Sequence, residues 1–241
     1  MRYRQDLRDA IAGADENIVA MYLGDARPAI PGDGCYLVYD AAANSLAAVP
    51  QLPPSVSWFT HGPVGPGSGL LYQYAIDGSN PENKASLFTW FSSGDGDACQ
   101  WIEQELSLPV PSGFHADIVF SLPDAAIICW AGLFSGILLL CDCDCDRIAT
   151  PARFRFVPLP AECQVDAKLL LELGDPAIYR SACSASSNAI KFVQLDAFGP
   201  IEERRLALWV LNMRSFEWSM PYASFRLVNL WSDRLTPCTG S

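Results

Sequence analysis

The sequence predicts an all-β protein, a kelch-like or β-propeller-like repeat of about four four-stranded blades, not necessarily complete, with one or two short helices. Residues 117–160 contain four strand-length apolar runs, DIVFSL, AIICWA, GILLLC and RFRFVPL, separated by the turn formers Pro, Gly and Asp. A pattern of apolar run, polar turn, apolar run and proline also recurs, with first runs that begin at Leu37, Leu87 and Ile137. Their spacing of about 50 residues is the period of kelch-type propellers.

Four hairpins follow from this pattern, and further strand candidates lie between them. The hairpins are Cys35–Pro54, Ser86–Pro109, Gly136–Pro160 and, with a looser match, Leu206–Pro221. In the first, Asp and Asn favour the turn and the prolines end the second strand. Two additional strands per period would complete each blade, and a blade must stack on its neighbours to cover both of its faces. The additional candidates are Asn17–Leu23, Gly69–Ile76, Asp117–Leu122, Ala126–Ala131, Tyr179–Ser184 and Ala189–Leu195.

We expect one propeller-like domain over residues 1–241. Tyr3, Leu7, Ala10 and Ile11 have helical spacing, which predicts a short helix over residues 2–12 within a helical or irregular lead. The Gly- and Pro-rich stretch 61–69 and the polar stretch 78–84 are expected to be surface loops. An ordinary β-sandwich is the alternative. The expected divisions are the lead 1–16, blades 17–60, 61–112, 113–160 and 177–223, an insertion 161–176 that is one short helix or extended, and a further blade or tail 224–241.

A membrane span is the rival interpretation of one segment. Ala125–Cys141 carries no charge, and Gly132 and Gly136 have the spacing of a helix-dimerisation motif. The run is at the lower limit of length for a span, and Asp124 and Asp142 flank it in place of Lys or Arg. Two buried strands joined by a hairpin corner at the glycines explain the segment better.

Composition restricts the partners and the compartment. The chain has 16 Lys plus Arg against 27 Asp plus Glu, a formal charge of −11, and no basic cluster, which disfavours nucleic acid and anionic membranes. Nine cysteines without a regular framework favour a reduced setting. The N-terminal residues lack an apolar core of signal-peptide length, so we expect an intracellular protein, cytoplasmic or nuclear.

Several blocks carry a resemblance to a known family. They are YLVYDAAANSLAAVPQLPP, DIVFSL, GILLLCD, RFRFVPLP, YRSACSASSNAIKFVQLD, LALWVLNMRSFEW and LVNLW, from about Cys35 to Trp231. In this order they resemble the DUF1618 family, which are plant, mainly grass, proteins of unknown function. The resemblance implies a β-rich, propeller-like fold and supplies no activity, cofactor or site residue. Such proteins often continue beyond the LVNLW block with more strand-forming sequence, so the resemblance leaves a shortened member of the family as one alternative.

The run CDCDCD is the strongest candidate for a metal site, and we expect none there. On a strand, Cys141, Cys143 and Cys145 share one face, roughly 6.6 Å apart, which suits one zinc ion poorly. Asp142, Asp144 and Asp146 copy the start of a calcium loop, but Arg147 stands where that loop needs Gly. Arg153 stands where it needs Glu. The expected structure is a buried strand end that runs into a solvated acidic turn.

No catalytic constellation emerges from the remaining residues. His61 and His115 lie outside any Ser, Cys or Asp motif, and Gly65–Gly69 lacks the Lys and helix of a phosphate cradle. The seven tryptophans recur inside strand blocks, which favours core packing over a binding surface. They are Trp58, Trp90, Trp101, Trp130, Trp209, Trp218 and Trp231.

The sequence therefore predicts a non-enzymatic protein-interaction scaffold without catalytic, cofactor or metal residues, whose protein partners and binding residues are unknown. It also predicts self-association if the propeller is open, because exposed strand edges and apolar faces would need cover. The alternative is an enzyme or small-ligand binder with a pocket at the propeller mouth. There, Asp40, Asp95 or Asp117 would act in acid-base chemistry.

Overall fold

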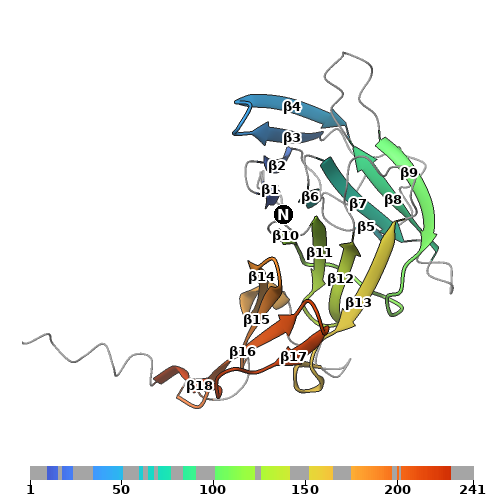
Figure 1. Ribbon diagram of the computed structural model, residues 1–241. Coiled ribbons are helices and arrows are strands. Elements are labelled where there is room, and N and C mark those ends of the chain that lie inside the picture. Colours follow the sequence, from blue (N-terminus) through green and yellow to red (C-terminus); the bar gives the residue numbers. More distant parts are fainter. Residues whose placement is uncertain are drawn as a thin grey trace, which may run out of the picture. The chain divides into compact units, whose positions relative to one another are not determined.

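The described residues of the protein form four antiparallel sheets of four or five strands (Figure 1). Most neighbouring strands in each sheet are also neighbours in sequence, so short connections join them. The all-β class is confirmed in this form, whereas the kelch-like propeller stays a prediction. The structure, a computed structural model, describes residues 10–15, 18–23, 35–50, 60–61, 65–67, 70–76, 84–90, 101–122, 126–141, 152–164, 175–196, 200 and 202–228.

The first sheet contains the first predicted hairpin. Asp40 ends the third strand, and its Oδ1 accepts bonds from the N–H groups of Ala42 (2.9 Å) and Ala43 (3.0 Å). Asn44 closes the turn at φ 48°, a conformation that Asn tolerates well. The helix expected over residues 2–12 is wrong where it is described, because backbone pairing with the second strand makes residues 10–15 a strand. The strands, in spatial order, are β1 (Ala10–Asp15), β2 (Ile18–Leu23), β3 (Cys35–Asp40) and β4 (Ser45–Pro50).

The second sheet contains the second predicted hairpin, with Trp90 opposite Trp101 at its turn end. It also corrects the loop expected at 61–69. Residues 60–61 and 65–67 both pair with the strand that follows them, since a ladder of backbone bonds needs no apolar side chains. The strands are β5 (Thr60–His61), β6 (Gly65–Gly67), β7 (Leu70–Ile76), β8 (Lys84–Trp90) and β9 (Trp101–Ser107).

The third sheet settles the rival interpretations of the apolar run. Residues 127–132 and 136–141 are two antiparallel strands that meet where Gly132 faces Gly136, so the hairpin is confirmed. A Cβ on Gly132 would lie 2.5 Å from the carbonyl oxygen of His115, which explains the glycine there. In the described part of the chain, no helix is long and apolar enough to cross a membrane. The strands are β10 (Ile118–Leu122), β11 (Ile127–Gly132), β12 (Gly136–Cys141) and β13 (Arg153–Pro158).

The chain divides into two compact units, Met1–Pro158 with the first three sheets and Leu159–Ser241 with the fourth. The single domain over 1–241 stays a prediction. Two one-turn 3-10 helices, η3 (Ala161–Cys163) and η4 (Pro176–Ile178), lie at the ends of the expected insertion, and residues 165–174 between them are outside the described ones. The strands of the fourth sheet are β14 (Arg180–Ser186), β15 (Ala189–Leu195), β16 (Arg205–Asn212), β17 (Glu217–Ser219) and β18 (Phe225–Arg226).

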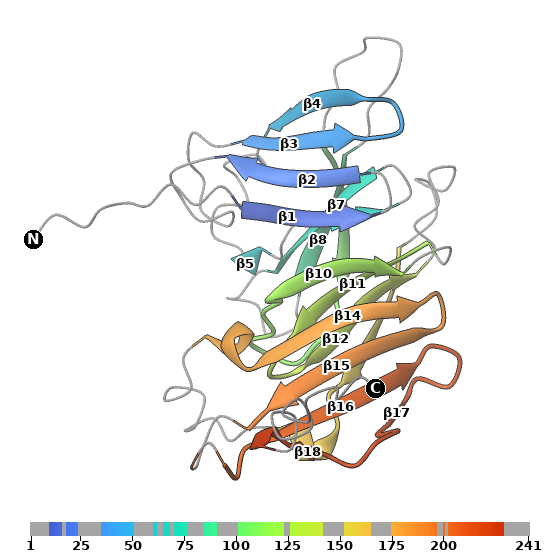
Figure 2. The ribbon, with the colours of Figure 1, turned by 90° about the vertical axis from the view of Figure 1, so that its left-hand side faces the viewer.

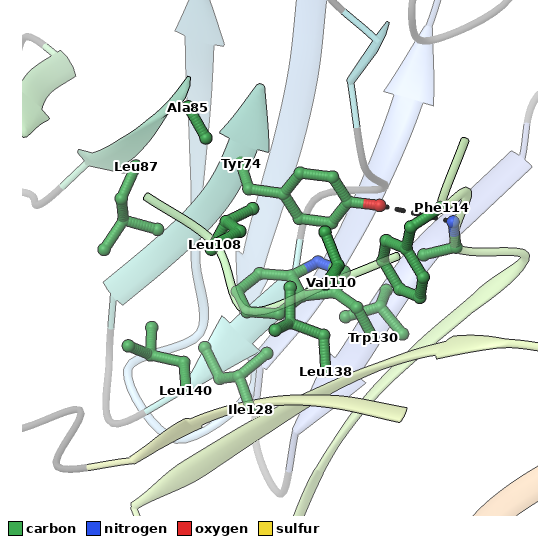
Figure 3. Close-up of a cluster of buried hydrophobic side chains, with 12 residues drawn as sticks. Tyr74, Ala85, Leu87, Leu108, Val110, Phe114, Ile128, Trp130, Leu138 and Leu140 are labelled. Carbon is green, nitrogen blue, oxygen red and sulfur yellow. Dashed lines mark hydrogen bonds between the residues drawn. The ribbon is translucent and has the colours of Figure 1, made fainter. Parts of the chain in front are cut away.

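An aromatic cluster forms the main core of the first unit (Figure 3). Tyr74 of β7 and Trp130 of β11 are fully buried and meet edge to face, with ring centroids 5.5 Å apart. The buried N–H of Ala116 donates to the Tyr74 hydroxyl at 3.2 Å, so one side chain both fills the core and holds the connection that leads to β10. Burial raises the pKa of Tyr74, because the charged phenolate would lose its hydration in this core, and the bond from Ala116 opposes part of this effect.

Tryptophans also supply the other cores. Trp90 packs with Tyr36, Val38 and Val49 of the first sheet. In the second unit, side chains alternate between the two faces of the fourth sheet, and one of these faces is buried. Trp209 and Phe192 lie opposite each other on this face. The core role predicted for Trp90, Trp130 and Trp209 is confirmed; Trp101 and Trp218 are half-buried, and Trp58 and Trp231 lie outside the described residues.

The Tyr74 hydroxyl gives a first test. Tyr74→Phe removes the acceptor of a buried N–H, so we expect the free energy of unfolding to fall by about 1–3 kcal/mol. Tyr39→Phe is the matched control, because the Tyr39 hydroxyl donates to Asn44 Oδ1 in an exposed bond of 3.2 Å, and it should cost less than about 0.5 kcal/mol. Urea unfolding of both variants measures the difference. Equal losses would show that the Tyr74 bond does not hold the core.

Candidate functional site

The carboxylates proposed for the propeller mouth have structural roles. Asp40 accepts two backbone bonds in the β3–β4 turn. Asp117 Oδ2 accepts the N–H of Leu133 at 2.7 Å, and the Asp117 N–H donates to the carbonyl of Ala131 at 2.9 Å. Asp40 thus fixes a turn within the first sheet, and Asp117 fixes a turn within the third. Asp95 lies outside the described residues, so an acid-base pair built from these three has no support among the described residues.

The histidines and the acidic cysteine run contribute no metal site in the described part of the chain. His115 is exposed, and His61 lies in β5 opposite Ala75. Cys141 ends β12, whereas residues 142–146 lie outside the described ones. Among the described residues, no group of three His, Cys, Asp or Glu is placed to hold a metal ion.

One buried cation stands out in the second unit. Arg180 is almost fully buried at the start of β14, and its Nη2 donates to the carbonyl of Cys163 at 2.8 Å, which ties η3 to the sheet. Burial lowers the pKa of Arg180, an effect that the nearby Cys163 opposes. Burial also raises the pKa of Cys163 to about 11, and the positive charge of Arg180 reverses only part of this effect. Cys163 is thus a protonated structural thiol, unsuited to nucleophilic chemistry.

The outer edge of the fourth sheet is irregular. β17 pairs with β16 up to the match of Ser219 with Val210, and β18 resumes the pairing where Phe225 faces Leu206. Residues 220–224 therefore stand opposite only residues 207–209. Figure 2 shows β17 and β18 at opposite ends of β16. Pro221 lacks the N–H that a continuous ladder would need, so the ladder is interrupted by a bulge here.

This bulge presents large apolar side chains to solvent. The ring centroids of Tyr222 and Phe225 lie 6.4 Å apart. Phe225 shares a sheet face with Leu206 and Leu208, which are only half-buried, so the apolar area continues from the bulge onto the sheet. We call the four exposed residues the bulge surface: Met220 (42% exposed), Tyr222 (59%), Phe225 (45%) and Val228 (44%).

Two arginines flank the same edge. Arg205 of β16 lies directly opposite Arg226 of β18, and both side chains are exposed. Nη1 of Arg205 donates to Ser224 Oγ at 3.2 Å, which places the Ser224 hydroxyl beside the pair. Like charges at facing positions of a sheet repel each other, so the pair is not explained by the stability of the sheet. The bulge surface and this arginine pair are the candidate functional site.

Sequence reasoning missed this site. From the sequence, Pro221 predicts only the end of a hairpin, and residues 224–241 predict a further blade or a tail. The cross-strand pair of Arg205 and Arg226 becomes visible only with the register of β16 and β18. The sequence SMPYASFRLV did offer one signal, since a proline interrupts an otherwise apolar and aromatic run.

Comparison with known families matches the second half of the chain. The model of DUF1618, described as "Protein of unknown function (DUF1618)", matches residues 130–240, a little less than half of the chain. The match begins within β11 and includes the whole described part of the second unit, with the bulge surface and the arginine pair. The resemblance expected from about Cys35 onward is thus supported from residue 130. No curated protein matches the chain.

The environment of Cys163 predicts slow alkylation. A rise in pKa from 9.0 to about 11 lowers the thiolate fraction at pH 8 by about 100-fold, and burial slows access further. In pulse labelling with iodoacetamide, followed by mass spectrometry of peptides, Cys163 should react at least about 100-fold more slowly than the exposed Cys183. In urea the two rates should converge. Rapid labelling of Cys163 in the folded protein would show that its thiolate is activated.

Proposed function

We propose that this protein, which carries a DUF1618 domain over residues 130–240, is a non-enzymatic protein-interaction module that binds a partner protein through the bulge surface. The observation that carries the proposal is the exposure of four large apolar side chains within nine residues, Met220 to Val228. Contiguous exposed apolar area on a folded protein is characteristic of interaction sites. Aromatic residues and arginine, both present here, are the types most enriched in the residues that dominate binding energy.

The structural roles of the other candidate groups support the same proposal. Asp40 and Asp117 hold turns, Cys163 is protonated, and Arg180 is buried in the sheet that it stabilises. None of these four is free for chemistry. The bulge surface, in contrast, has exposed side chains that the fold does not need for its own core.

The finer architecture and the compartment belong to the proposal as well. We take the four sheets to be blades of a kelch-like repeat, because each is an antiparallel sheet of four or five strands and they follow one another in sequence. We place the protein in the cytoplasm or nucleus. The free thiols at Cys35, Cys163 and Cys183 support a reducing compartment.

Binding assays with matched surface variants test the proposal. The full chain would be used to capture proteins from extracts of cells that express it, and each captured protein would be purified and titrated against the chain by calorimetry. A double variant Tyr222→Ser and Phe225→Ser should weaken a specific 1:1 complex by at least about 10-fold, as loss of aromatic contact residues does. Ile178→Ser is the control, since Ile178 is equally apolar and 77% exposed but lies in η4.

Circular dichroism and melting temperature should be unchanged in all these variants, because the substituted side chains are exposed. If every partner binds the double variant as tightly as the original chain, the bulge surface is not the interaction site. If Ile178→Ser weakens binding as much as the double variant does, the site lies elsewhere on the second unit.

A further inference from the structure

We propose that the arginine pair binds a carboxylate of the partner, so that the bulge surface receives an acidic segment that also carries aromatic or aliphatic residues. This inference rests on the proposed function and specifies the chemistry of the partner. It starts from the placement of two cations that the fold itself does not require. Arg205 and Arg226 occupy facing positions of β16 and β18.

Within the described residues, the two guanidinium groups have unused hydrogen-bonding capacity. Each carries five N–H donors, and the bond from Arg205 Nη1 to Ser224 Oγ accounts for one of them. Neither arginine forms an ion pair with any residue that the structure describes. Because Arg205 donates to the oxygen of Ser224, the hydroxyl proton of Ser224 is directed to another acceptor. Because facing residues of paired strands project to the same face of the sheet, Arg205, Arg226 and the Ser224 hydroxyl offer donors on one side of the strand edge.

An anion at this point would remove the repulsion between the two arginines. Facing like charges destabilise a pair of strands, and one carboxylate that bonds both guanidinium groups converts the repulsion into two charge-assisted bonds. The carboxylates nearest to Arg205 in sequence, those of Asp196, Glu202 and Glu203, form no ion pair with either arginine in the described structure. In the proposed complex, a carboxylate of the partner supplies the compensating charge.

The distribution of charge directs an acidic partner to this unit. Residues 1–158 contain 8 Lys or Arg and 18 Asp or Glu, whereas residues 159–241 contain 8 and 9. The net charges are −10 and −1, so the first unit repels an acidic segment and the second does not. The arginine pair gives the nearly neutral unit a local positive site next to its exposed aromatic residues.

Apolar contacts complete the site. Phe225 adjoins Arg226 in sequence and, by strand alternation, points to the opposite face of the same edge. An extended segment that crosses the edge meets Tyr222 and Phe225 with its apolar side chains, and its carboxylate reaches the arginine pair. The proposed partner therefore has both acidic and apolar residues. Acidic residues alone would contact only the arginine pair, and apolar residues alone would contact only the bulge surface.

A fluorescein-labelled peptide of alternating Glu and Phe residues is a suitable probe for fluorescence polarisation with the full chain. We expect saturable binding that weakens as salt is raised, because exposed charges are screened. The matched peptide with Gln in place of Glu should bind about 10-fold more weakly. The variant Arg226→Gln should lose about the same factor, and Arg214→Gln, an exposed arginine in the β16–β17 turn, should lose nothing.

Arg226→Gln has a second, independent signature. Removal of the facing like charge should raise the melting temperature of the unbound protein by about 2 °C while it weakens binding. A merely structural arginine would lower stability when replaced. Equal binding of the Glu and Gln peptides, or a fall in melting temperature for Arg226→Gln, would overturn the carboxylate proposal.

The outcomes separate this inference from the proposed function. If Tyr222→Ser with Phe225→Ser abolishes peptide binding and Arg226→Gln does not affect it, the bulge surface stands and the carboxylate site is wrong. If only Arg226→Gln weakens binding, the arginine pair stands and the apolar bulge surface is not the docking site. If light scattering shows a dimer that Arg226→Gln dissociates, the occupant is a second copy of this chain, and the proposal of a separate acidic partner fails.

Discussion

The contact between Tyr74 and Trp130 is the interaction on which the first unit depends. It joins the sheet of β5–β9 to the sheet of β10–β13, and both side chains are fully buried. A four-stranded sheet has two faces and cannot cover them alone, so its stability comes from such contacts between sheets. The bond between the Ala116 N–H and the Tyr74 hydroxyl adds a directional constraint to a core that is otherwise apolar. This bond fixes the position of Ala116, which lies just before β10.

The second unit shows how the same kind of sheet can present a surface. Its buried face carries Phe192, Trp209 and Leu211, and its other face and outer edge are less covered. Pro221 interrupts the ladder at this edge, and the bulge leaves the side chains of Met220 and Tyr222 exposed. The irregularity lies within the part of the chain that matches the DUF1618 model. We therefore connect it with the function of that domain and not with folding alone.

Most strands could be predicted from sequence because their signals are local. The runs that form β11 and β12 are strand-length, lie between turn formers and meet at glycines. The β3–β4 turn is specified by the side chain of Asp40 and by the backbone conformation that Asn44 tolerates. The strand Ala10–Asp15 was missed because the spacing of Ala10 and Ile11 also fits a helix, and pairing with β2 overrides that local preference. Gly65–Gly67 was missed because a backbone ladder leaves no pattern in side chains.

The candidate site was hidden for a different reason. Arg205 and Arg226 are far apart in sequence, and they face each other only because the bulge shifts the register between β17 and β18. Nothing in the local sequence encodes that shift except Pro221. The roles of Asp117 and Arg180 were hidden in the same way, since each depends on a bond to a distant backbone group.

Site-specific photo-crosslinking tests the central claim, that the bulge surface is where a partner protein docks, most directly. A p-benzoylphenylalanine placed at position 222 of the full chain should crosslink to the bound partner, because the Tyr222 side chain is exposed in the middle of the bulge. The same group at position 178 or 46, where Ile178 and Leu46 are also exposed, should give no crosslink. Crosslinks from position 178 or 46 and none from position 222 would contradict the account.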